Sequence, residues 1–132
     1  MYRYIRKIRV QDTDATGVLY FANLLQIGLE AFEEFMDQNG HKIGDVIQEK
    51  KFLYPIVHAE GDFFAPIYVS DEIEVTLSFP KKGTTSFTHS SVMTRNGEKV
   101  GAVSIVHVAY SNEEGKSIPL PEKLEKLIAS CV

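Results

Sequence analysis

The chain has 132 residues, of which 44% are hydrophobic and 24% are charged, and its formal net charge is -4. This composition is typical of one globular domain spanning residues 1–132, and the acidic balance argues against a nucleic-acid partner. Cys131 is the only cysteine, and zinc-like spacing of Cys and His is absent, so we expect neither a disulfide nor a metal. No apolar run reaches the ~20 residues of a membrane span, and the N-terminus lacks a signal-peptide core. We therefore expect a cytoplasmic protein without a membrane partner.

The first expected elements are a strand and a long helix. Residues 2–11 alternate between apolar and basic side chains, which predicts a strand with one solvated face. From Phe21, apolar residues recur at i, i+3 and i+4, which predicts an amphipathic helix of about five turns. Asn39 and Gly40 suit the end of this helix, and a shorter helix is expected over residues 43–50.

The next part of the chain alternates like β structure. Strands are expected over residues 54–65, 72–79, 85–95 and 98–110. Gly61 suggests a bulge in the first of them, and Asn96-Gly97 is the strongest hairpin signal in the chain. A short helix is expected near residues 122–130, after two prolines.

This order of elements predicts an α+β fold. A curved antiparallel sheet of about five strands, wrapped around a long central helix, would cover the helix's apolar face. The strand expected over residues 98–110 is apolar on both faces, whereas one helix covers only one of them. We therefore expect the other face or a sheet edge to meet a second subunit, in a homodimer or homotetramer.

The stretch DTDATGVLYF, residues 12–21, joins the first strand to the long helix. One interpretation is that Asp12 and Asp14 only turn the chain and cap the helix, as Asp, Thr and Gly commonly do. A second is catalytic, because free N–H groups at a helix start can bind a carbonyl and stabilise its oxyanion. A carboxylate beside them can attack the carbonyl or activate water, and Asp14 lies nearer to the helix than Asp12. A D-x-D pair without further ligands is a weak metal signal.

This motif, extended to D-T-D-A-T-G-V-L-Y-F-A-N, resembles the 4-hydroxybenzoyl-CoA thioesterase branch of the hotdog-fold acyl-CoA thioesterases. The expected element order is also that of the hotdog fold, so the resemblance covers nearly the whole chain. The stretches PIVHAEGDFFAPIYVSD, residues 55–71, and LEAF, Leu29 to Phe32, are similar to the cyanobacterial-type 1,4-dihydroxy-2-naphthoyl-CoA thioesterases. The resemblance implies hydrolysis of an aromatic acyl-CoA on the route to phylloquinone or menaquinone, without a cofactor.

The resemblance also implies roles for particular residues. The catalytic carboxylate, acting as nucleophile or general base, maps onto Asp14, and the backbone N–H that polarises the thioester carbonyl maps onto Phe21. Tyr54 and His58 match the region near the acyl ring. Tyr54 departs from the small hydroxyl residue of the hydroxybenzoyl-specific enzyme, which argues against hydroxybenzoate as the acyl group. On an apolar strand, His58 could instead be a buried structural histidine.

Other polar residues have weaker functional signals. Surface Lys and Arg suit the phosphates of CoA, which makes Lys82, Arg95 and Lys99 candidate CoA contacts, although charged turn residues are usually only solvated. Glu30 either lines the pocket or is solvated. The remaining histidines are expected to be structural or solvent-facing: His41, His89 and His107.

Two alternative functions stay open at this point. One is a broad short-chain or 4-hydroxybenzoyl-type acyl-CoA thioesterase of the same branch. The other, from a different class, is a non-catalytic acyl-CoA-binding protein, against which the intact Asp14 argues.

Overall fold

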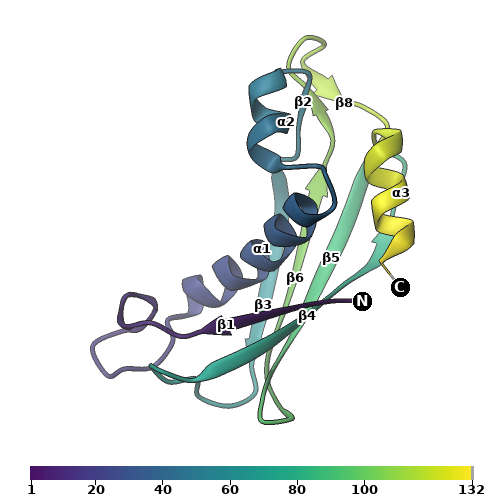
Figure 1. The fold of residues 1–132 in the computed structure, drawn as a ribbon. Helices are drawn as coiled ribbons and strands as arrows, with labels where there is room; N and C mark the ends of the chain where they lie inside the picture. The colour runs from purple at the N-terminus through teal and green to yellow at the C-terminus, as the bar shows by residue number, and fades with distance from the viewer. Residues whose placement is uncertain (132) are drawn as a thin grey trace.

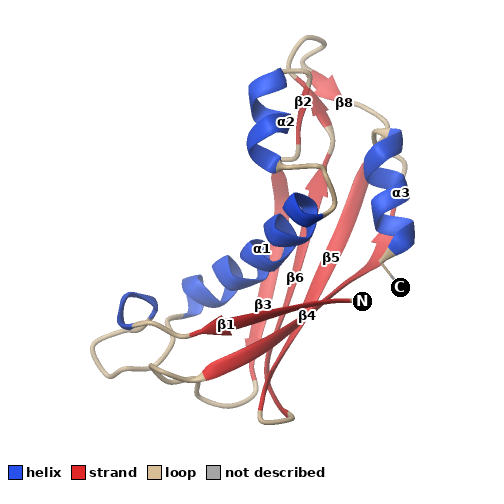
Figure 2. Ribbon diagram, viewed as in Figure 1, coloured by secondary structure: helices blue, strands red, loops and turns tan. Residues whose placement is uncertain are grey.

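The computed structural model describes residues 1–131. A five-stranded antiparallel sheet, in the order β1–β4–β5–β6–β3, curves around helix α1 (Phe21–Gln38) (Figures 1 and 2). This arrangement confirms the α+β fold expected from the sequence. The strands are β1 (Tyr2–Lys7), β3 (Ile56–Phe63), β4 (Glu72–Lys82), β5 (Ser86–Arg95) and β6 (Glu98–Val108).

Shorter elements surround the sheet. Helices α2 (Ile43–Glu49) and α3 (Glu122–Ser130) agree with the two short helices predicted. A three-stranded second sheet was not predicted, because strands of two residues show no alternation. Its strands are β2 (Phe52–Leu53), β7 (Tyr110–Ser111) and β8 (Lys116–Ser117). Within residues 1–131, no helix is long and apolar enough to cross a membrane.

The first strand is shorter than the predicted residues 2–11. Strand β1 ends at Lys7, and a single 3-10 turn, η1 (Val10–Asp12), follows it. The turn forms because the carboxylate of Asp12 accepts a hydrogen bond from the Arg9 N–H at 2.7 Å. Val10 is 75% exposed and therefore does not share the buried face that the alternation predicted for it.

The irregularity in β3 does not lie at Gly61. The register against β6 shifts between Ile56 and His58, whereas Gly61 pairs regularly with Val103. A Cβ at Gly61 would lie 3.2 Å from a methyl carbon of Leu25 on α1. This glycine therefore allows the helix to pack closely on the strand.

Helix α1 packs its apolar face on the concave side of the sheet. Close contact with β6 depends on Gly28, because a Cβ there would lie 2.7 Å from Cγ1 of Val103. Two apolar clusters form, one along each half of the helix. The first includes Leu24, Ile27, Val75, Val103 and Ile105, and the second includes Phe32, Phe35, Leu77, Phe87 and Leu124 of α3.

Strand β3 lies at one edge of the sheet, as Figure 1 shows. Three of its apolar side chains are well exposed: Ile56 at 45%, Val57 at 60% and Phe63 at 37%. The subunit contact predicted from the sequence stays a prediction.

Candidate active site

Asp14 lies in a tight loop between η1 and α1. Its N–H donates to the Val18 carbonyl at 2.9 Å, and its own carbonyl accepts from the Gly17 N–H at 3.1 Å. Gly17 has a φ of +79°, a left-handed conformation that glycine adopts without strain. The loop is therefore ordered by its own backbone, while the Asp14 side chain is exposed.

The carboxylate of Asp14 is bound on one side only. Its Oδ1 accepts from the Thr16 hydroxyl at 2.5 Å, from the Thr16 N–H at 2.8 Å and, more weakly, from the Val18 N–H at 3.4 Å. These donors, led by the Thr16 hydroxyl, lower the pKa of Asp14. Its Oδ2 has no hydrogen-bond partner within residues 1–131, so all three donors bind the same oxygen of the carboxylate.

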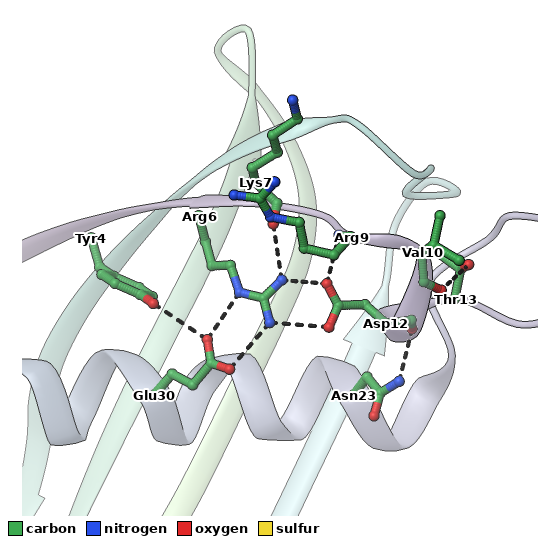
Figure 3. A network of polar contacts seen from close by, with 9 residues as sticks. All are labelled: Tyr4, Arg6, Lys7, Arg9, Val10, Asp12, Thr13, Asn23 and Glu30. Carbon is green, nitrogen blue, oxygen red and sulfur yellow. Dashed lines mark hydrogen bonds and ion pairs between the residues drawn. The ribbon is translucent and has the colours of Figure 1, made fainter.

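Asp12 has a different environment, although it is only two residues away. Its carboxylate is buried and accepts from two nitrogens of the Arg6 guanidinium (Figure 3). Arg6 also donates to both oxygens of Glu30 on α1, at 3.0 and 3.1 Å. The hydrogen bond from Arg6 is the main reason that the pKa of Asp12 is lowered. Asp12 therefore braces the turn, and Glu30 is neither fully solvated nor part of the apolar cavity described below.

The same turn is tied to the first residues of α1. The carbonyl of Asp12 accepts from the Tyr20 N–H at 3.1 Å and from the side-chain amide of Asn23 at 2.8 Å. Within residues 1–131, the N–H groups of Phe21 and Ala22 have no hydrogen-bond acceptor. Tyr20 is the N-cap and makes no side-chain cap bond, so the interpretation that an aspartate caps α1 is wrong. The helix start is left open beside the loop that carries Asp14.

A mostly apolar cavity of about 310 Å³ lies further along α1. Tyr54 is part of its wall, and the Tyr54 hydroxyl is 2.8 Å from Nε2 of His41. Burial raises the pKa of Tyr54, so this hydroxyl stays protonated. The other residues around the cavity are Leu29, Phe32, Glu33, Ile43, Val46, Ile47, Leu53, Pro55, Ile56 and His107.

His58 lies away from this cavity. It pairs with Val106 in the β3–β6 ladder, on the face of the sheet opposite α1. Its side chain is 60% exposed and its Nε2 is 3.4 Å from Glu60. The structure therefore contradicts the alternative of a buried structural histidine, and it does not bring His58 together with Tyr54.

The three candidate CoA contacts do not form one cluster. Lys82 ends β4 beside α3, where it pairs with Glu125 at 2.9 Å. Arg95 pairs with Asp71 at 2.7 Å. Only Lys99 is placed near an exposed aromatic surface, because its Nζ lies 4.9 Å from the centre of the Phe64 ring.

Phe64 belongs to a shallow apolar groove beside the start of α1. Val18 and Leu19 also contribute to this groove, which has a volume of about 330 Å³. The neighbouring Phe63 ring lies 6.3 Å from the ring of Phe21. Lys99 thus lies over an aromatic side chain of this groove, and Arg95 also reaches it by donating to the Pro66 carbonyl at 2.8 Å.

The sequence did not indicate a polar pair in the core. His89 and His107 lie under α1 with their Nε2 atoms 3.0 Å apart, and both are buried. Burial lowers the pKa of His89 to about 3 and lowers that of His107 as well. Phe32 stacks on His89 with ring centres 4.6 Å apart. Both histidines are buried and stay neutral at physiological pH because their pKa values are lowered, and His107 also borders the cavity described above.

A sheet wrapped around one long helix, with an exposed carboxylate beside the open helix start, defines the class of hotdog-fold thioesterases. A family model described as the thioesterase-like superfamily matches residues 8–128. The chain belongs to this superfamily. The match does not reach the narrower 4-hydroxybenzoyl-CoA branch, which stays a prediction.

Individual relatives give a more specific likeness. A 1,4-dihydroxy-2-naphthoyl-CoA hydrolase from Rippkaea orientalis is 35% identical over 133 residues, which cover 98% of this chain and 96% of that protein. One of the same name from Synechococcus elongatus is 34% identical, over 94% and 92% of the two chains. The crystal structure of a 1,4-dihydroxy-2-naphthoyl-CoA thioesterase from Synechocystis superposes with a TM-score of 0.92 at 28% identity, covering 98% of this chain and 96% of that one.

Proposed function

We propose that this protein hydrolyses an aromatic acyl-CoA, with 1,4-dihydroxy-2-naphthoyl-CoA as its substrate, to the free acid and CoA. The observation that carries the proposal is the exposed Asp14 carboxylate in a loop hydrogen-bonded to the open start of α1. The likeness to hydrolases of that name over nearly the full chain supports the choice of substrate.

In the proposed reaction, the thioester carbonyl accepts hydrogen bonds from the free N–H groups of Phe21 and Ala22. These donors stabilise the oxyanion that forms when the carbonyl is attacked. Asp14 either attacks the carbonyl itself or removes a proton from the attacking water, and its lowered pKa keeps it ionised for both roles. The C–S bond then breaks. If Asp14 is the nucleophile, the acyl group is first held as a mixed anhydride on Asp14, and water hydrolyses it to the free acid and the carboxylate. In both routes a proton from the water reaches the CoA thiolate, so CoA leaves as the thiol. Carboxylate and backbone donors supply both functions, so the proposal includes no cofactor.

The proposal also includes a homodimer formed through β3. An exposed edge strand presents unpaired backbone groups, and antiparallel pairing with a second copy would satisfy them. Ile56 borders the apolar cavity, whereas Phe63 contacts Phe21 at the helix start. Antiparallel pairing places the Phe63 end of one strand beside the Ile56 end of the other.

In this pairing, the apolar cavity of one subunit would bind the acyl group that the Asp14 loop of the other subunit hydrolyses. Within one chain, Leu29 lies eight residues, or about 12 Å, along α1 from Phe21. In the proposed dimer, the catalytic loop of one subunit would face the cavity of its partner instead. The cavity is mostly apolar and includes Tyr54 and Phe32, which suits a flat aromatic acyl group.

The substrate assignment is tested with a panel of acyl-CoA thioesters and a free-thiol readout. The panel contains naphthoyl, benzoyl, 4-hydroxybenzoyl and short aliphatic members. We expect the highest kcat/KM for 1,4-dihydroxy-2-naphthoyl-CoA. A preference for short aliphatic chains would replace the aromatic assignment with a broad thioesterase, and tight binding without turnover would replace it with an acyl-CoA-binding protein.

A further inference from the structure

We propose that Thr16 is a positioning residue for Asp14: its hydroxyl holds one carboxylate oxygen so that the other is presented to the substrate. The inference rests on the proposed function, because it assigns a role within the same site. It concerns a residue that does not itself contact the reacting atoms.

The geometry around Asp14 is one-sided. Both the hydroxyl and the N–H of Thr16 donate to Oδ1, at 2.5 and 2.8 Å, and the Val18 N–H approaches the same atom at 3.4 Å. Oδ2 has no partner in the part of the chain that the structure describes. Donors that converge on one oxygen fix the rotation of the carboxylate and leave the second oxygen in a defined direction.

The Thr16 hydroxyl gives Oδ1 of Asp14 a second strong donor in addition to the Thr16 N–H. Asp14 is exposed, so no packed side chains limit its torsion angles. The Thr16 N–H fixes the position of Oδ1, and the hydroxyl gives that atom a second strong donor from another direction. Threonine suits this task because its branched side chain has few rotamers.

The effect of Thr16 on the orientation of the Asp14 carboxylate can be separated from its effect on the charge of that carboxylate. The Thr16 hydroxyl is the largest contribution to the lowered pKa of Asp14, so its loss raises that pKa. At pH 7.5 Asp14 is nevertheless ionised with or without the hydroxyl, since its ordinary pKa is only 3.8. A lower kcat at pH 7.5 would therefore report the direction of the carboxylate rather than its charge.

The experiment compares Thr16→Val, Thr16→Ser and a matched control, Thr13→Val. The Thr13 hydroxyl also makes a short local hydrogen bond, to the Val10 carbonyl at 2.8 Å, but not to Asp14. The first readout is the carboxyl titration of Asp14 by NMR, which does not depend on activity. The second is kcat and KM for 1,4-dihydroxy-2-naphthoyl-CoA at pH 7.5. Thr16→Ala serves as a second hydroxyl-free variant if Thr16→Val does not fold.

For Thr16→Val we expect a higher Asp14 titration midpoint and a kcat at least about fivefold lower, with KM little changed. Thr16→Ser and Thr13→Val should both stay close to the wild-type protein. The inference is overturned if Thr16→Val matches Thr13→Val in both readouts, or if Thr16→Ser fails to restore kcat.

A failure of the proposed function gives a different pattern. If Asp14→Asn turns over substrate at the wild-type rate, Asp14 is not the catalytic group, and the role of Thr16 falls with it. If Asp14→Asn is inactive while Thr16→Val behaves as the wild-type protein, only the positioning role is wrong.

Discussion

The guanidinium group of Arg6, on β1, donates to the Asp12 carboxylate and also to Glu30 on α1 (Figure 3). One arginine therefore ties the turn before the loop that carries Asp14 to the central helix. Asp14, two residues further on, takes no part in this network. The two acids of the D-x-D motif thus have separate tasks, which mutation can distinguish.

Asp12→Asn should destabilise the fold. It removes one of the two charges that pair with the largely buried Arg6, while Glu30 stays as the other. Because the Arg6 and Asp12 side chains are still 16% and 11% exposed, we expect a loss of about 2 kcal/mol in urea unfolding, less than for a fully buried pair. Asp14→Asn is the control, since an amide oxygen can keep the bonds from Thr16. Equal midpoints of unfolding for the two variants would contradict this division of tasks.

Gly28→Ala should also destabilise the protein, although alanine favours helices. The added Cβ would lie 2.7 Å from Cγ1 of Val103, and such overpacking typically costs about 1–3 kcal/mol. Gly44→Ala on α2 is the matched control, because nothing lies within 4 Å of its Cβ position. There the substitution should raise the free energy of unfolding by up to about 1 kcal/mol. A Gly28→Ala protein as stable as Gly44→Ala would show that α1 packs less tightly on β6.

The free energy of unfolding should decrease as the pH is lowered from 7 to 5, above the range in which carboxylates titrate. The pKa of His89 is about 3 in the folded state and 6.5 in the unfolded chain. As the pH drops below 6.5, the unfolded state therefore binds a proton at His89 that the folded state does not bind. From pH 7 to pH 5, His89 alone should remove about 2 kcal/mol from the free energy of unfolding. The lowered pKa of His107 acts in the same direction.

Urea unfolding at pH 7, 6 and 5 measures this dependence. His58→Gln is the matched control, because this histidine is exposed and lies outside the buried pair. Equal free energies of unfolding at pH 7 and pH 5 would mean that the buried histidines are not held neutral.

A larger side chain at the cavity should alter the choice of substrate. Ile47 borders the cavity and is 54% exposed, so Ile47→Trp should fill space without disturbing the core. We expect kcat/KM for the naphthoyl thioester to fall by about tenfold relative to a short aliphatic one. Ile5→Trp is the control, because Ile5 is 57% exposed on β1 and does not border the cavity. Equal losses on both substrates would place the acyl group elsewhere.

The sequence predicts best where the structure depends on local patterns. The repeat of apolar residues from Phe21 predicts α1, and Asn96-Gly97 predicts the β5–β6 hairpin because both residues adopt positive φ. Alternation holds along β1, where Tyr2, Tyr4 and Arg6 are half-buried and the residues between them are exposed. It does not show which acids pair with Arg6 on that face, because Glu30 lies 24 positions away.

The candidate site could be predicted only in part. The motif shows that Asp14 precedes a helix, but not that Tyr20 leaves the helix uncapped or that Thr16 binds one carboxylate oxygen. The cavity joins α1, α2 and the residues around Tyr54, whose proximity depends on tertiary packing. The exposure of His58 follows from its place on the sheet face opposite α1, which its apolar neighbours in sequence do not reveal.

The central claim is that the Asp14 carboxylate performs the hydrolysis. Its most direct test is the steady-state hydrolysis of 1,4-dihydroxy-2-naphthoyl-CoA by purified Asp14→Asn, after its fold is verified by circular dichroism. We predict that kcat falls by about 100-fold or more with little change in KM, as expected for loss of a catalytic base or nucleophile. A loss of less than about tenfold would contradict the claim, because general acid–base groups typically contribute at least about 100-fold.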